Sequence, residues 1–178
     1  FVKAYPQIEV KIHNVTGQAG LALLRDGEVD FCVGPLLEVP EDIAFHPIVS
    51  YEPLLITALD HPLAKRKRVT LTDISKYPLI LPPRELSTWR IVESEFTKHG
   101  LPHNVKLEVG GWEVIKTYVE LGLGISIVMS ICITGDEKLA VIPVSKWFPN
   151  RTYGVVMRKG RAVSAQAHRF IEIMGPQV

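Results

Sequence analysis

Residues 79–129 read LILPPRELSTWRIVESEFTKHGLPHNVKLEVGGWEVIKTYVELGLGISIVM, and short apolar runs alternate there with longer amphipathic stretches. The runs at 79–81, 105–109 and 125–129 have the length and composition of buried strands, and the stretches between them have the spacing of helices. Strands that alternate with helices are typical of an α/β fold with a parallel sheet. We therefore predict an α/β unit over this part of the chain.

The two helices of this unit have recognisable ends. A proline pair ends the first strand, and Ser87 or Thr88 is a candidate N-cap for a helix that runs to His99. Gly110-Gly111 leads into the second helix, which we predict over 112–121. Because ligands bind at the carboxyl ends of strands in open α/β sheets, both helix starts are candidate binding positions.

The N-terminal part of the chain shows a similar order of elements. Phe1–Ala4 has the character of a helix end, and Ile8–Ile12 alternates apolar and charged residues like a strand. Thr16 is a candidate N-cap for a helix over 17–27. Phe31–Val33 follows as a short apolar run, as expected of a central parallel strand. A chain that opens inside an element is expected to be a piece of something longer.

Two further strands connect these parts of the chain. Residues 53–59 predict a strand into the second unit, and residues 152–158 predict a strand that returns from it. We expect these two strands to pair antiparallel as a two-stranded hinge. Ser164 is a candidate N-cap for a last helix, whose apolar residues at i, i+3, i+4 and i+7 would cover the first unit.

The predicted architecture is therefore two Rossmann-like α/β lobes joined by two crossing strands. Lobe I comprises residues 1–55 and 157–178, and lobe II comprises residues 56–156. Two lobes joined in this way leave a cleft between them, and strands of both lobes would end there. This cleft is the predicted place for a ligand.

The composition is that of an ordinary globular protein. The 178 residues are 47% hydrophobic and carry a formal net charge of +1, which argues against nucleic-acid binding by this part of the chain alone. Cys32 and Cys132 each lie in an apolar run, which favours reduced, buried thiols of a cytoplasmic protein over a disulfide. The longest apolar stretch, residues 121–133, is too short to span a bilayer.

Four segments, taken in order, carry a family resemblance. They are Phe1-x3-Tyr5-Pro6-x-Ile8-x-Val10, Leu24-x2-Gly27-x2-Asp30-Phe31, Asp60-His61-Pro62-Leu63-Ala64 and the run from Thr117 to Ile125. In this order and spacing they resemble the effector-binding domain of LysR-type bacterial transcription regulators. The resemblance covers nearly the whole chain, and residues 114–119 are most similar to the cysteine-regulon activators of that family.

This resemblance implies a fold and a function. The fold is that of type II periplasmic binding proteins, here without its first strand and the start of its first helix. The function is to sense a small anionic metabolite that binds in the cleft between the lobes. The family also implies a homodimer or homotetramer in the cytoplasm, with helices 17–27 and 88–99 at the interface. DNA would be bound only through an N-terminal helix-turn-helix outside this chain, and no membrane partner is implied.

Two positions depart from the family pattern. Val15 stands where many relatives have glycine, and Pro35 stands where the cysteine-regulon pattern has threonine. Thr16 and Ser87, in contrast, match positions that carry hydroxyl groups. The resemblance therefore keeps two hydroxyl contacts to an effector and loses one.

The predicted effector-binding residues lie at helix starts and strand ends. Free backbone N–H groups and the helix dipole favour anions at such positions. Thr16 and Ser87 could equally serve only as helix caps, and Trp89 and Trp112 could be ordinary packing residues instead of pocket walls. The predicted set is Thr16, Gly17, Gly34, Pro35, Ser87, Thr88 and Trp112.

The sequence does not indicate catalysis or a metal. The six histidines form no HxxxH or HxH pair, Ser87 has no evident histidine and acid partners, and no GxSxG elbow occurs. We therefore predict no enzymatic activity, no catalytic residue, no metal and no cofactor. The basic run Lys65–Arg68 is predicted to be a solvated loop, with a minor contact to DNA or polymerase as the alternative.

A periplasmic solute-binding protein of the same fold is the alternative function. Such a protein would bind a ligand and would never contact DNA. The sequence upstream of Phe1 would distinguish the two, because one requires a signal peptide and the other a helix-turn-helix. The family resemblance and the reduced character of the cysteines favour the regulator.

Overall fold

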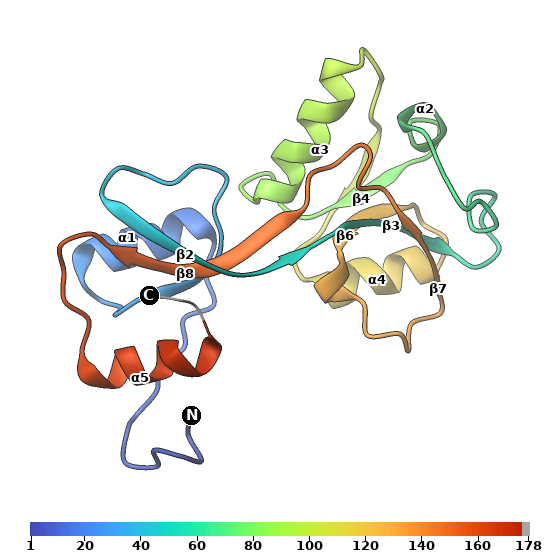
Figure 1. Ribbon diagram of the computed structural model, residues 1–178. Coiled ribbons are helices and arrows are strands. Elements are labelled where there is room, and N and C mark those ends of the chain that lie inside the picture. Colours follow the sequence, from blue (N-terminus) through green and yellow to red (C-terminus); the bar gives the residue numbers. More distant parts are fainter. Residues whose placement is uncertain (176–178) are drawn as a thin grey trace. The chain divides into compact units, whose positions relative to one another are not determined.

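The computed structural model describes residues 1–175, and the chain divides into two compact units (Figure 1). Unit 1 contains Phe1–Ser50 and Thr152–Val178, and unit 2 contains Tyr51–Arg151. The chain therefore passes between the units twice, which confirms the predicted architecture of two α/β lobes joined by two strands. The predicted lobe limits at 55/56 and 156/157 fall inside strands of the structure and stay predictions.

Unit 1 is a three-stranded sheet with one helix on each face (Figure 1). The strand order is β1-β8-β2, and β8 pairs antiparallel with β1. Val156 packs with Leu24 of α1, while the adjacent Val155 packs with Ile171 of α5, because successive strand residues point to opposite faces. The elements are α1 (Gly17–Asp26), β1 (Cys32–Pro35), β2 (Ile43–Tyr51), β8 (Arg151–Arg158) and α5 (Ala165–Met174).

Unit 2 contains two sheets that meet at one point. Strand β3 lies between β6 and β7 and is antiparallel to both, whereas β4 and β5 pair in parallel. A parallel bridge between Leu79 and Ile125 joins the two sheets. The elements are β3 (Pro53–Ala58), α2 (Leu71–Ile74), β4 (Leu79–Leu81), α3 (Ser87–Lys98), β5 (Val105–Glu108), α4 (Trp112–Glu120), β6 (Ser126–Met129), the short 3-10 helix η1 (Ser130–Cys132) and β7 (Leu139–Pro143).

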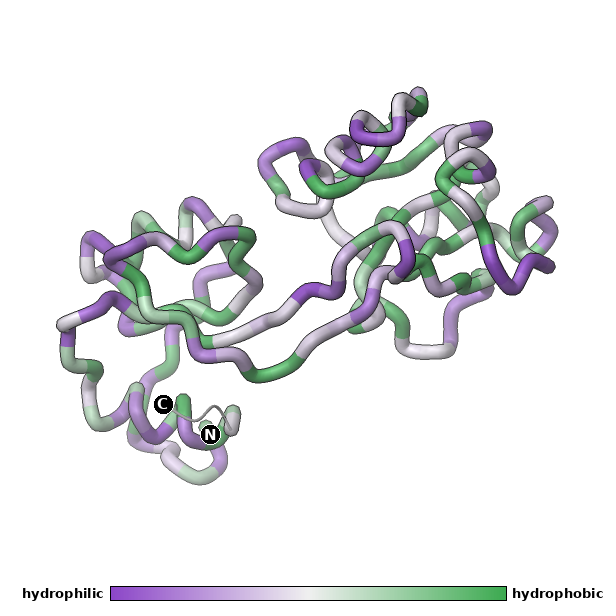
Figure 2. The backbone as a smooth tube through the Cα atoms, turned by 45° about the horizontal axis from the view of Figure 1, so that its top comes forward, coloured by the Kyte–Doolittle hydropathy of each residue, from purple (hydrophilic) through white to green (hydrophobic). Residues whose placement is uncertain are grey.

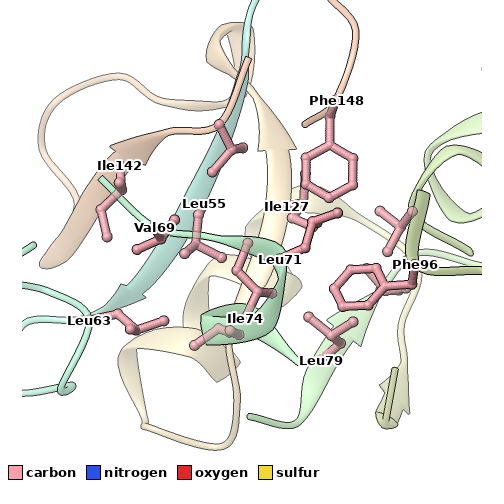
Figure 3. Close-up of a cluster of buried hydrophobic side chains, with 14 of the residues drawn as sticks. Leu55, Leu63, Val69, Leu71, Ile74, Leu79, Phe96, Ile127, Ile142 and Phe148 are labelled. Carbon is pink, nitrogen blue, oxygen red and sulfur yellow. The ribbon is translucent and has the colours of Figure 1, made fainter. Parts of the chain in front are cut away.

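The core of unit 2 lies against β3. Leu55 points into a cluster that also contains Ile127, Phe96 and Phe148, and each of these side chains is at most 1% exposed (Figure 3). The next residue, Ile56, points to the opposite side and packs with Val119 of α4. Because both faces and both edges of β3 are covered, this strand lies at the centre of the unit.

The predicted strand at Ile8–Ile12 is not formed. Within residues 1–175 no strand pairs with this segment, and Ile12 is 86% exposed. Alternating apolar residues form a strand only where a neighbouring strand satisfies their backbone groups. The predicted helix end at Phe1–Ala4 is a single turn, in which the Tyr5 N–H donates to the Phe1 carbonyl, and the Phe1 ring packs 4.7 Å from that of Phe170.

The predicted strand at Phe31–Val33 exists, but its pairing differs from the prediction. Strand β1 lies at the edge of its sheet and runs antiparallel to β8, whereas we predicted a central parallel strand. Its parallel partner would have been the segment Ile8–Ile12, which is unpaired. The exposure pattern agrees with an edge position, since Val33 is 53% exposed.

The predicted hinge pairing is wrong. Residues 152–158 pair with β1 and β2, and not with the strand at 53–58. The physical reason is that β6 and β7 already occupy both edges of β3. The strands that cross between the units are therefore β2 and β8, and the hydroxyl oxygens of Ser50 and Thr152 lie 2.7 Å apart where the chain crosses.

Two smaller predictions are confirmed. Ser164 caps α5 by accepting a hydrogen bond from the Ala167 N–H, and α5 packs on unit 1. The run Lys65–Arg68 is exposed and forms a strongly hydrophilic stretch of the backbone trace, purple in Figure 2. Within it, Arg66 pairs with Asp73 at 2.9 Å.

Candidate functional site

The parallel strands of unit 2 bring two helix starts to the same edge. Leu81 of β4 pairs with Glu108 of β5, and the chain continues from these strands into α3 and α4 respectively. Because the two strands are parallel, both helices begin at their shared carboxyl edge. The predicted positions at Ser87 and at Gly110-Gly111 are therefore brought to one edge of unit 2.

These two helices begin without a side-chain cap. The N-cap residues are Leu86 for α3 and Gly111 for α4, and neither side chain accepts a hydrogen bond from the first turn. The helices α1, α2 and α5 are capped by the hydroxyls of Thr16, Thr70 and Ser164. Uncapped N–H groups carry the positive end of the helix dipole, so both starts favour an anion.

The prediction that Ser87 or Thr88 caps α3 is wrong. Ser87 is the first residue inside the helix, and its Oγ accepts a hydrogen bond from Nη2 of Arg151 at 2.5 Å. Arg151 is only 5% exposed, so its charge lies inside unit 2 next to the start of α3. Sequence reasoning missed Arg151, because 64 residues separate it from Ser87 and no local pattern marks it.

Thr88 and Trp89 differ in what they can offer a ligand. Trp89 is 4% exposed and belongs to the hydrophobic core with Val92 and Phe96, which supports the packing interpretation. Thr88 is 6% exposed, and its hydroxyl has no hydrogen-bond partner in the described part of the chain. Trp112 begins α4 and is half-buried against Ile115 and its neighbours, so it packs and still reaches the surface.

The predicted residues of unit 1 lie at the start of α1 and along β1. Thr16 caps α1 by accepting a hydrogen bond from the Ala19 N–H at 3.4 Å, which confirms the cap and leaves the hydroxyl proton available. A side-chain atom added at Gly17 or Gly34 would meet no other atom within 4 Å, so the backbone is accessible at both. Pro35 pairs with Tyr153 at the end of β1. The cleft between the lobes stays a prediction.

A hollow of about 330 Å³ lies elsewhere in unit 2, beside α4 and the loop that follows η1. Lys116, 4% exposed, donates hydrogen bonds there to Glu137 and to the Cys132 carbonyl, and it pairs with Glu113 at 2.9 Å. The Lys116 ammonium and the backbone N–H of Thr134 hold the pKa of Glu137 well below its ordinary value. Burial by itself would lower the pKa of Lys116, but its two carboxylate partners raise it overall.

Residues 1–175 contain no group of side chains arranged for metal binding. No group of three or more histidine, cysteine, aspartate or glutamate side chains in this part of the chain could hold a metal ion. Cys32 and Cys132 are both free thiols, and burial raises the pKa of each. The Cys32 thiol donates to the Gly20 carbonyl, which agrees with the predicted reduced state. None of the helices among the described residues has the length and apolar character needed to cross a bilayer.

Two α/β units joined by two strands, with uncapped helix starts at one sheet edge of unit 2, offer positions that favour an anionic ligand. Comparison with protein families gives a more specific assignment, because the LysR substrate binding domain matches residues 1–178. The chain therefore belongs to the family of LysR substrate-binding domains, as its sequence motifs predicted.

Individual relatives agree with this assignment. The chain is 29% identical over 181 residues to the HTH-type transcriptional regulator SsuR of Burkholderia cenocepacia, with 100% of this chain and 59% of SsuR covered. It is 30% identical over 170 residues to CysB of the same organism, with 94% and 50% covered. The solved cofactor-binding domain of the Cbl transcriptional regulator is 27% identical and superposes with a TM-score of 0.85, covering 97% of this chain and 79% of that one.

These comparisons confirm the predicted fold class and favour a regulator domain over a periplasmic solute-binding protein. CysB is among the similar proteins, in agreement with the predicted similarity to cysteine-regulon activators. The chain spans between a half and three fifths of the length of these curated relatives.

Proposed function

We propose that this domain binds a small anionic metabolite and that its occupancy controls a longer DNA-binding regulator. The observation that carries the proposal is the pair of uncapped helix starts at one edge of unit 2, one of them joined to the buried Arg151. Uncapped N–H groups favour negative charge, and the guanidinium holds the Ser87 hydroxyl beside one of these helix starts. The Cbl structure, described as a cofactor-binding domain, supports a small-molecule role for this fold.

The free energy available from each group is small, so several groups must contribute to effector binding together. One helix dipole contributes about 0.3–1 kcal/mol to binding an exposed anion, and up to about 2 kcal/mol in a partly buried site. A hydrogen bond to a charged group contributes about 1.5–3 kcal/mol. We therefore propose that the effector contacts Ser87, Thr88 and the backbone at Gly110-Gly111, with Trp112 beside it.

We also propose effector contacts from unit 1, for reasons that do not depend on the helix starts of unit 2. Thr16 keeps a hydroxyl proton to donate, and the backbone is accessible at Gly17 and Gly34. Pro35 offers only its carbonyl and ring, because proline has no N–H. We expect the unit 2 residues to contribute most of the affinity for an anion.

The relatives support three further proposals for the whole protein. Both curated relatives are HTH-type transcriptional regulators that are longer than this chain. We propose that a helix-turn-helix segment provides the DNA contact, that the protein acts in the cytoplasm, and that it assembles as a homodimer or homotetramer. The helices α1 and α3 are the proposed interface elements. We propose that the domain itself is not an enzyme.

Isothermal titration calorimetry of the 1–178 chain tests the proposal. The ligands are sulfate, O-acetylserine and N-acetylserine, with uncharged glycerol as the control. We expect at least one acid to bind and glycerol to give no heat. Ser87→Ala should weaken that binding about tenfold, because it removes one hydrogen bond to a charged ligand. The matched control Thr97→Ala removes an exposed hydroxyl at the other end of α3 and should leave affinity unchanged. If no acid binds across a broad panel of anionic metabolites, the proposal is wrong.

A further inference from the structure

We infer that Arg151 is a positioning residue of the effector site, which fixes the Ser87 hydroxyl as a hydrogen-bond donor toward the ligand. This inference rests on the proposed function. It assigns the ligand a chemical preference: the group that meets the Ser87 proton is a hydrogen-bond acceptor, such as a carboxylate, sulfate or phosphate oxygen.

The direction of the Arg151–Ser87 hydrogen bond carries the first step. An arginine guanidinium has only donors, so the Ser87 Oγ must be the acceptor at 2.5 Å. One lone pair of that oxygen is then occupied, and the hydroxyl proton is left to donate elsewhere. A serine that rotates freely can point its proton in several directions, whereas a serine held in this way keeps one lone pair and points its proton away from the arginine.

Ser87 does not cap the helix, which is the second step. Ser87 lies inside α3 and is not its N-cap, and α3 begins at Leu86 without a side-chain cap. Ser87 therefore does not serve the ordinary purpose of a hydroxyl at a helix start. A hydrogen bond from a buried arginine to a hydroxyl outside the capping position fits a role in orienting that hydroxyl.

The neighbouring Thr88 gives independent support. Its side chain is 6% exposed and its hydroxyl has no hydrogen-bond partner among the described residues. Within residues 1–175, every fully buried side-chain nitrogen or oxygen has a partner. The Thr88 oxygen must therefore reach the surface, although the rest of its side chain is covered. A second hydroxyl is thus open to a ligand in the first turn of α3.

Arg151 also lies where the chain passes from unit 2 to unit 1. It is the first residue of β8 and the last residue of unit 2, and the next residue, Thr152, pairs with Ser50 at 2.7 Å. A ligand that engages Ser87 therefore acts on a residue that belongs to a crossing strand. Sequence motifs would not indicate this link, because it depends on a contact across 64 residues.

A double-mutant cycle with sulfate as the probe tests the inference. We compare the wild-type chain with Arg151→Met, Ser87→Ala and the double variant by calorimetry. Because Arg151 acts through Ser87, each single variant should weaken sulfate binding about tenfold, and the double variant should bind about as weakly as either single one. Arg151→Lys keeps one donor and the charge, and it should lose less affinity than Arg151→Met. Arg158→Gln, an exposed arginine of the same strand, is the matched control and should bind as the wild type does.

The outcomes separate the two proposals. If wild-type protein binds sulfate and the double variant loses the product of the two single losses, Arg151 acts independently of Ser87 and the inference is overturned. The same holds if Arg151→Lys and Ser87→Ala both bind as tightly as the wild type. Should Arg151→Met fail to fold in circular dichroism, the comparison of Arg151→Lys with Ser87→Ala decides. Absence of binding by wild-type protein to sulfate and to every acid of the panel would instead refute the proposed function, and the inference with it.

Discussion

Lys116 illustrates how unit 2 accommodates a buried charge. Its ammonium lies against Glu137 at 2.7 Å and Glu113 at 2.9 Å, and its remaining contact is the Cys132 carbonyl. Burying a cation costs several kcal/mol of solvation, and these partners offset that cost. The cluster joins α4 to the loop after η1, so it holds in place the helix whose first turn belongs to the proposed effector site.

The Glu137 carboxylate predicts an acid-dependent contribution to stability. Its pKa is lowered in the folded chain by Lys116 and by the N–H groups of Thr134 and Gly135, whereas an unfolded glutamate titrates near about 4.3. The contribution is therefore present above about pH 4.3 and is lost as the pH falls below that value. The Glu137→Gln variant has no carboxylate to titrate at this position. Its urea midpoint should therefore be lower than that of the wild type at about pH 7, and should fall less than that of the wild type between about pH 5 and about pH 3.

Urea unfolding at the three pH values measures this effect, with Glu9→Gln as the control. Glu9 is 82% exposed and pairs only loosely with Lys11, at 3.9 Å, so its substitution should not change the midpoint. An unchanged pH dependence in Glu137→Gln would show that the carboxylate contributes nothing to folding.

At the scale of elements, local patterns predicted some parts of the fold and not others. Strands β3 to β6 and the helices α3, α4 and α5 were predictable because buried apolar runs, glycines and prolines mark them in sequence. Strand β2 was not predicted, since Pro47 interrupts it, and an edge strand tolerates the missing N–H. Of the candidate site, the helix starts were predictable from the sequence. Arg151 was not, because a contact between distant residues leaves no local signal.

Two glycines face each other across β1 and β8, and we expect substitution by alanine to change stability differently at each. Gly34 pairs with Gly154. A methyl group at Gly154 would collide with the His46 carbonyl and the Phe45 ring of β2, whereas one at Gly34 would meet no atom within 4 Å. Gly154→Ala should therefore cost about 1–3 kcal/mol through overpacking. Gly34→Ala should be neutral or stabilise by about 0.4–1 kcal/mol, because it restricts the unfolded chain.

The free energy of unfolding from urea titration compares the two variants directly. Both change the same residue type to the same product in paired positions, so each serves as a control for the other. Equal losses of stability in the two variants would contradict the close approach of β8 to β2.

At the scale of the whole molecule, two strands connect the units. The question is how much a single contact at these connections can change the response of the domain to a ligand. The chain crosses at 50/51 and at 151/152, in strands β2 and β8 of one sheet. Under the proposed function, a ligand that moves a two-state equilibrium from 1:99 to 99:1 must prefer one state by about 5.5 kcal/mol. No single neutral hydrogen bond supplies that, because each is worth about 0.5–1.5 kcal/mol. The preference must come from many contacts, and a single contact at the crossing can supply only a part of it.

The Ser50–Thr152 hydroxyl pair tests this limit. Thr152→Val keeps the shape of the side chain and removes the hydroxyl, and Ser50→Ala removes the same hydrogen bond from its other end. Each should lower the free energy of unfolding by about 0.5–1.5 kcal/mol, and the double variant should lose no more than one single variant, because all three remove one bond. In calorimetry with an acid that binds the wild type, each should change the dissociation constant by less than about tenfold. A loss of binding of more than about a hundredfold in Thr152→Val would mean that this one contact governs the response. The crossing would then act as a switch, and the distributed preference argued from the magnitudes would be wrong.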